Sequence, residues 1–186
     1  MRLFVALPLP PDIAEAAFRC APDLPALRRV KPELMHVTLA FLGRTPDERL
    51  ADTSAAVEAA ADRVTAFDIE LDRPGRFPTS GRPRVVWIGI GAGAPAVLAL
   101  GERVRGELAR REVAFDDKPL RAHVTLGRVR EDVALVHARA IAAATEAMRV
   151  PHLRFRADAV VIFESVLSPR GPKYTPRASA PLRVGA

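Results

Sequence analysis

The chain has 186 residues, of which 49% are hydrophobic and 27% are charged, and its formal net charge is +6. These proportions are typical of a soluble globular protein, and no apolar run approaches the roughly 20 residues that span a bilayer. The single cysteine, Cys20, cannot form an internal disulfide, so a reducing compartment and a cytoplasmic location are expected. The apolar stretch of residues 3–9 is short and interrupted by prolines, which indicates a first strand rather than a signal peptide.

Apolar residues recur with a period of two in some segments and of about 3.6 in others, which predicts strands and helices in alternation. The expected strands are residues 2–8, 34–42, 67–71, 84–90 and 121–129, one long or two short strands over 153–167, and an edge strand over 173–179. The expected helices are residues 12–27, 45–63, 95–111 and 132–148. Residues 73–81 are rich in glycine and proline and are expected to form turns. The pattern predicts a mixed α+β fold.

The chain contains an internal repeat. A helix, a strand that begins His-Val-Thr-Leu, a second helix and a second strand follow one another around residues 12–71 and again around 95–163. Such a duplication predicts two similar α+β lobes related by a pseudo-twofold axis. No long polar linker separates the copies, so we expect one bilobed domain over residues 1–186, complete in one chain and therefore a monomer.

Two of the four histidines, His36 and His123, open the identical tetrapeptides. Residues two apart along a strand share a face, so His36 points the same way as Thr38, and His123 the same way as Thr125. If a pseudo-twofold axis relates the lobes, two imidazoles and two hydroxyls meet at one place. On spacing alone, a structural role for the repeat is an equal alternative, because a duplication also copies packing residues.

Two imidazoles on either side of a phosphodiester can divide the proton transfers of hydrolysis. A neutral imidazole accepts a proton from water, and a protonated one donates to the departing ribose oxygen. Threonine hydroxyls can donate hydrogen bonds to the other phosphate oxygens. Arg128, five residues after His123, would lie on the opposite face of an ideal strand, but a bulge near Gly127 would turn it towards the phosphate. This chemistry requires no metal and no cofactor.

The segments around both motifs resemble the 2H phosphoesterase superfamily, and most closely its RNA 2',3'-cyclic phosphodiesterases, also called 2'-5' RNA ligases. The resemblance rests on residues 2–7, 30–43, 77–78, 82–87, 121–128, 163–165 and 174. It implies a bilobed α+β fold, with two antiparallel sheets lining a central cleft and helices on the outside. It also implies that RNA ending in a 2',3'-cyclic phosphate is hydrolysed to a 2'-phosphomonoester, and that 2'-5' ligation without ATP is similar chemistry in reverse.

The same resemblance implies a role for each motif residue. His36 would be the proton donor and His123 the proton acceptor. The two threonines, Thr38 and Thr125, would hold the phosphate together with Arg128.

Three further residues are candidates for contact with RNA. Arg29 stands where the family often has an aromatic residue, so a guanidinium would replace a base platform there. Arg121 is retained before the second motif, although its apolar neighbours are smaller than those of the family. Phe41 is expected in the core, with a position at the edge of the site as the alternative.

Two other functions remain open from the sequence. One is an RNA-binding module without catalysis, which would use the same basic surface. The other keeps the chemistry but takes small cyclic nucleotides or 2'-5'-linked oligonucleotides as substrates.

Overall fold

The computed structural model describes residues 1–169 and 171–185. The strands are β1 (Arg2–Pro8), β2 (Leu27–Arg29), β3 (His36–Arg44), β4 (Phe67–Phe77), β5 (Val85–Ile90), β6 (His123–Val129), β7 (Leu153–Ala157), β8 (Ala159–Ser168) and β9 (Gly171–Pro181). The helices are α1 (Pro11–Cys20), α2 (Leu50–Ala61), α3 (Ala94–Arg110) and α4 (Leu135–Ala147), with 3₁₀ turns at Pro32–Leu34 and Asp47–Arg49. The predicted α+β class is confirmed. None of the helices in these two ranges is long and apolar enough to cross a membrane.

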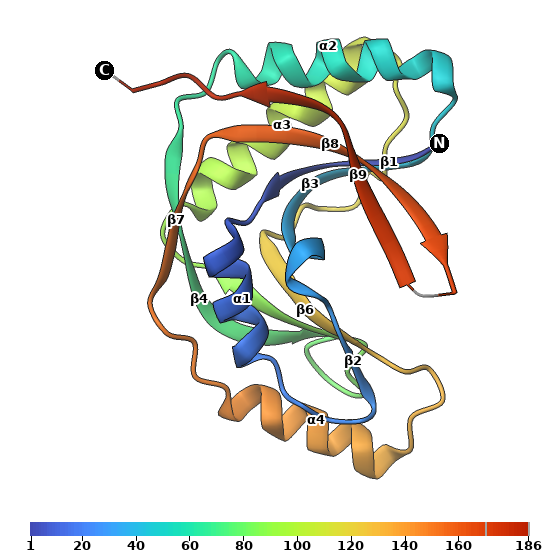
Figure 1. The fold of residues 1–186 in the computed structure, drawn as a ribbon, viewed down its shortest axis with the longest axis vertical. Helices are drawn as coiled ribbons and strands as arrows, with labels where there is room; N and C mark the ends of the chain where they lie inside the picture. Colours follow the sequence, from blue (N-terminus) through green and yellow to red (C-terminus); the bar gives the residue numbers. More distant parts are fainter. Residues whose placement is uncertain (170, 186) are drawn as a thin grey trace.

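The strands form one continuous sheet in the order β7-β4-β5-β6-β3-β1-β8-β9, and β2 pairs with β6. Neighbouring strands run antiparallel, and a single residue pair, Val37 with Val124, joins β3 to β6. This pair divides the sheet into a first half (β3, β1, β8 and β9) and a second half (β6, β5, β4 and β7). The two sheets expected from the resemblance are therefore two halves of one curled sheet (Figure 1).

Each half-sheet is covered by two of the four helices. Helix α3 packs on β3 and α2 on β8 and β9, whereas α1 contacts β7 and α4 contacts β4 (Figure 1). Helix α1 precedes β3 in the sequence but covers the second half, and α3 precedes β6 but covers the first half. Each lobe is thus built from both sequence repeats, which interlocks the two halves.

The largest difference from the sequence prediction follows the first strand. The helix expected over residues 12–27 ends at Cys20, and residues 27–29 form the additional strand β2. Pro22 and Pro25 explain the early end, because proline lacks the N–H that a helix interior requires.

The second half-sheet and the C-terminal segment also differ in detail. Residues 74–77, expected as turns, continue β4 because they pair with residues 85–88 of β5. The segment over 153–167 divides into β7 and β8, and β9 forms a long hairpin with β8. The hairpin extends beyond the rest of the sheet (Figure 1).

The core lies between the sheet and the helices, and it determines which face of each strand is free. Val5, Val37 and Leu39 are fully buried in the first half, as are Val124 and Leu126 in the second. Because side chains alternate along a strand, the residues between them point to the opposite face. That opposite face carries the polar residues of both motifs.

Candidate active site

The two repeated motifs lie side by side at the junction of the half-sheets. In an antiparallel pair, the register of Val37 with Val124 puts His36 opposite Thr125, and His123 opposite Thr38. All four polar side chains therefore share one face, with the two histidines on a diagonal of about 7–8 Å. A local pseudo-twofold axis passes through the pair of valines.

Both imidazoles are held by the same contact to the backbone. The Nδ1 atom of His36 lies 2.8 Å from the carbonyl oxygen of Leu34, and that of His123 lies 2.6 Å from the carbonyl oxygen of Arg121. A carbonyl oxygen only accepts, so Nδ1 carries the proton in each ring. The Nε2 atom of each neutral histidine is therefore the one left for substrate, and it is the basic nitrogen.

Burial shifts both histidines towards the neutral form. It is the main cause that lowers the pKa of His36 to about 4, and the positive charges of His123 and Arg128 act in the same direction, opposed by the hydrogen bond to Leu34. Burial also lowers the pKa of His123, with smaller contributions in that direction from Arg128 and Arg121. Arg128 thus acts on both imidazoles, which indicates that it lies near both.

The two histidines have different aromatic neighbours. The ring of His36 lies 4.7 Å from that of Phe4 and 5.5 Å from that of Tyr174. The ring of His123 lies 5.2 Å from that of Phe77, edge to face. These rings restrict the imidazoles and exclude water from one side of each, in agreement with the lowered pKa values.

Bulges at equivalent points of β3 and β6 bring two further residues to the site. The β6 register with β5 shifts between Thr125 and Gly127, so the predicted bulge near Gly127 is confirmed. Arg128 lies five residues after His123, an odd number, and the extra residue of the bulge turns its side chain to the face of the histidines. The β3 register with β1 shifts in the same way, and Phe41, five residues after His36, occupies the place that corresponds to Arg128.

Phe41 does not lie in the core, and that expectation is wrong. Its side chain is 51% exposed, and its ring lies 6.4 Å from that of Phe4, on the same face as His36. The β3 bulge is the reason, because without it residue 41 would point to the buried face.

The two candidate arginines have different surroundings. The guanidinium of Arg29 lies over the ring of Phe18 at 4.4 Å and 3.5 Å from a carboxylate oxygen of Asp23. It is not among the charges that act on either histidine, so the structure does not bring it into the group around the phosphate position. Arg121 lies over the Phe77 ring at 5.1 Å, next to His123.

Sequence reasoning assigned no role to the aromatic residues around the histidines, Phe4, Phe77 and Tyr174. Phe4 has no signal in the sequence, because it lies within a continuous buried run of β1. Tyr174 has none either, because its contact with His36 depends on the long-range pairing of β1 with β8 and of β8 with β9. Within residues 1–169 and 171–185, no group of three or more His, Cys, Asp or Glu side chains is arranged to hold a metal ion.

Comparison with known proteins identifies the family. The family model described as the 2'-5' RNA ligase superfamily matches residues 8–167. The chain belongs to this superfamily. A relative from Archaeoglobus fulgidus, named RNA 2',3'-cyclic phosphodiesterase, is 33% identical, with 94% of this chain and 96% of the relative covered. A protein of the same name from Thermus thermophilus is also 33% identical, covering 94% of this chain and 87% of its own length.

Solved structures of the superfamily share the fold over the whole chain. TT0787 of Thermus thermophilus superposes with a TM-score of 0.81 at 28% identity, and both chains are fully covered. Escherichia coli LigT, crystallised with 3'-AMP, superposes with a TM-score of 0.77 at 26% identity over 97% of each chain. The sequence resemblance to 2H phosphoesterases is thereby confirmed.

Proposed function

We propose that this chain hydrolyses 2',3'-cyclic phosphodiesters at RNA ends to 2'-phosphomonoesters, without a metal or cofactor. His36 acts as proton donor and His123 as proton acceptor. The pairing of Val37 with Val124 supports this most directly, because it puts both imidazoles on one face, diagonally across the junction of β3 and β6. The names of the relatives from Archaeoglobus fulgidus and Thermus thermophilus support the choice of substrate.

In the proposed reaction, water attacks phosphorus on the side opposite the 3' oxygen. His123 takes the water proton on Nε2, and the bond between phosphorus and the 3' oxygen breaks. His36 gives the proton on its Nε2 to that oxygen, which leaves a 3' hydroxyl and a 2' phosphate. Thr38, Thr125 and Arg128 bind the non-bridging oxygens, where negative charge increases in the transition state.

The different surroundings of the two histidines support this choice of donor. The ribose that carries the leaving oxygen also carries a base, which can stack on an aromatic ring, and the exposed Phe41 offers one on the His36 side. His36 therefore faces the leaving oxygen. Water then attacks from the opposite side, where His123 receives its proton.

Binding of the phosphate provides the protonated donor. Without substrate, the low pKa of His36 keeps this imidazole neutral at neutral pH. The cyclic phosphate carries a negative charge and offsets the charge of Arg128, so it raises the pKa of His36 in the complex. The acid is thus formed when substrate is present.

The same arrangement accounts for ligation. If the 5' hydroxyl of a second RNA replaces water, His123 accepts its proton and the product is a 2'-5' linkage. This is the reverse of cleaving such a linkage to a cyclic phosphate, so 2'-5' oligonucleotides are also potential substrates of one site.

The test is an oligoribonucleotide ending in a 2',3'-cyclic phosphate, incubated with the protein and EDTA. We expect ring opening to a 2' phosphate, and we expect His36→Ala and His123→Ala each to lower the rate by about 10²–10⁴. His137→Ala, an exposed histidine on α4, is the matched control and keeps the wild-type rate.

Three outcomes would refute the proposal. Full activity in either motif variant would remove the two-histidine mechanism. A 3' phosphate product would reverse the assignment of the leaving oxygen. Salt-sensitive RNA binding by an inactive wild-type protein would identify a binding module.

A further inference from the structure

A cavity lies beyond the aromatic residues of the first half-sheet. It has a volume of about 600 Å³, and its lining includes Arg2, Arg44, Ser165, Val166 and Leu167. These residues come from the beginning of β1, the end of β3 and the end of β8, where the β8–β9 hairpin leaves the sheet (Figure 1). We call it the Arg2–Arg44 cavity.

The Arg2–Arg44 cavity is on the same face of the sheet as the two histidines. Phe4 packs on the ring of His36, and Arg2 lies two residues before it on β1; the extra residue of the nearby bulge, Leu42, belongs to β3, so the side chains of Arg2 and Phe4 point the same way. Arg44 is directly opposite Arg2, and His36 is opposite Pro8. The span from Pro8 to Arg2 along β1 is roughly 20 Å, which a few nucleotides can cover.

The cavity carries positive charge that no carboxylate neutralises. Within residues 1–169 and 171–185, neither Arg2 nor Arg44 forms an ion pair or a side-chain hydrogen bond. Like charges directly opposite each other destabilise a pair of strands. The nearby N-terminal ammonium, by contrast, is paired with Asp47 at 3.1 Å. Two adjacent arginines left unpaired beside an open cavity are suited to a ligand with several negative charges.

We infer that the Arg2–Arg44 cavity binds the RNA strand on the 5' side of the cyclic phosphate, with the two arginines on backbone phosphates. This inference rests on the proposed function. A cyclic phosphate closes the 3' end of its strand, so the other nucleotides can leave the site only on the 5' side. The aromatic surface at Phe41 lies on the His36 side, which directs the strand along the first half-sheet.

The surface between the two places is suited to a single strand. On the shared face of β3, Phe41 lies between His36 and Arg44, and it is exposed enough for a base to stack on it. At the far end, Leu167 is 68% exposed and Val166 is also exposed, so apolar surface continues beside the arginines. An aromatic platform followed by positive charge is the combination by which proteins bind single-stranded RNA.

The inference predicts that affinity depends on RNA length. We expect the wild-type KM to be lower for an octaribonucleotide 2',3'-cyclic phosphate than for a mononucleoside 2',3'-cyclic phosphate. The Arg2→Gln/Arg44→Gln variant should raise the octaribonucleotide KM on the order of tenfold and leave the mononucleoside kinetics unchanged. Glutamine keeps the strand pairing and most of the side-chain stem.

A binding measurement tests the cavity independently of turnover. The probe is a fluorescent octaribonucleotide ending in a 2' phosphate, titrated at several salt concentrations. For single strands, log K falls with log salt by about 0.7 per phosphate contact, so loss of two contacts should lower this slope by about 1.4. A circular dichroism spectrum identical to that of the wild type shows that the variant is folded.

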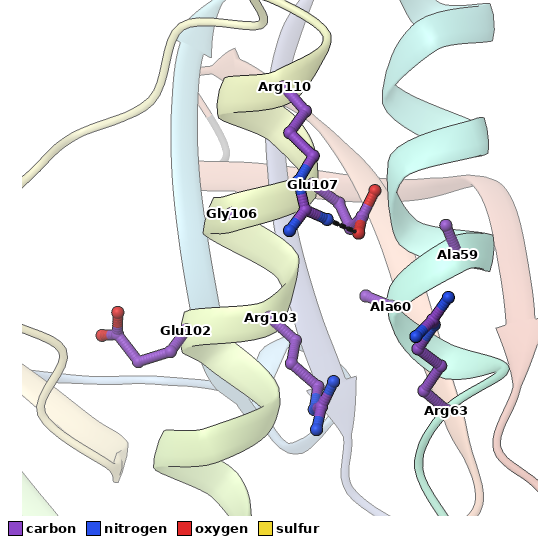
Figure 2. Close-up of a pocket in the computed structure, with 8 residues that line it drawn as sticks. All are labelled: Ala59, Ala60, Arg63, Glu102, Arg103, Gly106, Glu107 and Arg110. Atoms are coloured by element: carbon purple, nitrogen blue, oxygen red, sulfur yellow. Dashed lines mark hydrogen bonds and ion pairs between the residues drawn. The ribbon is translucent and has the colours of Figure 1, made fainter.

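The matched control removes two arginines from the other side of the sheet. Arg63 and Arg103 face the space between α2 and α3, where they line a cavity of about 260 Å³ (Figure 2). Arg63→Gln/Arg103→Gln changes the net charge equally but should have little effect on the octaribonucleotide KM or on the salt slope.

Each outcome decides the inference. A wild-type KM that does not fall with length, an unchanged octaribonucleotide affinity in Arg2→Gln/Arg44→Gln, or an equal loss in the control variant would overturn it. If the wild-type protein opens neither substrate, the proposed function fails. The salt slopes then still show whether the Arg2–Arg44 cavity binds RNA.

Discussion

The strands β3 and β6 carry the same tetrapeptide, the same bulge and the same carbonyl contact to the histidine ring. The residue five positions after the histidine, however, is Phe41 in β3 and Arg128 in β6. The surroundings of the two histidines also differ. His36 lies beside Phe4 and Tyr174 and is the more deeply buried of the two, whereas His123 lies beside Phe77 and Trp87 and next to the charge of Arg121.

This comparison separates two tasks of the site. The features common to both halves are the His-Val-Thr-Leu motif, the bulge and the carbonyl contact, and they hold two Nε2 atoms on one face. The features that differ are the neighbouring side chains, which in the proposed function distinguish a nucleoside side from a phosphate side. A symmetric site would bind a cyclic phosphate in two orientations, whereas in the proposed function Phe41 and Arg128 favour one.

Removal of the charge from the His123 half should have the largest effect. We expect Arg128→Ala to lower kcat by about 10²–10³, because a charged donor to the non-bridging oxygens is lost from the transition state. Arg128→Lys keeps the charge and should recover part of this loss. Steady-state kinetics on a cyclic phosphate substrate measure both variants. A wild-type kcat in Arg128→Ala would show that the arginine does not serve the phosphate.

The burial of His36 should make stability depend on pH. The folded pKa is about 4 and the unfolded pKa about 6.5, so between these values the unfolded chain binds more protons and the free energy of unfolding rises with pH. Acidification through this window therefore lowers the free energy of unfolding by about 3 kcal/mol, at about 1.36 kcal/mol per pKa unit.

His36→Asn tests this contribution, because the amide can still donate to the Leu34 carbonyl. Urea denaturation at the acidic end of this window and at neutral pH should show that the variant loses less stability on acidification than the wild type. Equal losses in both proteins would mean that His36 is not the buried base that the structure describes.

The threonines test the symmetric part of the site. Thr38→Val and Thr125→Val keep the shape but remove the hydroxyl, and each should cost about 1.5–3 kcal/mol in kcat/KM if the hydroxyl donates to a charged oxygen. The two losses should be similar because the motifs are related by the local twofold. Thr→Ser at either place should retain most activity. If only one of the two Thr→Val variants loses activity, the phosphate does not lie on the local twofold axis between β3 and β6.

The sequence predicts the features that depend on local pattern. The strands of both motifs, the common face of His36 and Thr38, and the bulge near Gly127 all follow from alternation and from the repeat. The end of α1 at Cys20 was not predicted, although Pro22 contains the signal. The exchange of helices between the half-sheets has no local signal, because it depends on long-range packing.

The site could be predicted only where the repeat supplies two copies to compare. Tyr174 and Phe4 are brought to His36 by the pairing of β1 with β8 and of β8 with β9, and no spacing in the sequence encodes these contacts. Phe41 was misjudged because a bulge in β3 changes its face. The bulge argument applied to Arg128 applies equally to Phe41, and the repeat would have shown this.

Removal of the aromatic ring from the His36 half should have a smaller effect, confined to binding. We expect Phe41→Ala to raise KM by an amount equivalent to about 1–3 kcal/mol, the usual worth of one stacked base, with kcat retained. Phe41→Trp should keep the wild-type KM because it preserves a flat ring.

A substrate without a base makes this last test decisive, because a ring that serves only for stacking has nothing to bind there. Ribose 2',3'-cyclic phosphate should therefore react equally well with the wild type and with Phe41→Ala. If Phe41→Ala impairs the baseless substrate as much as the nucleotide, the ring acts by packing on Phe4 beside His36, and the nucleoside side of the site must be sought elsewhere.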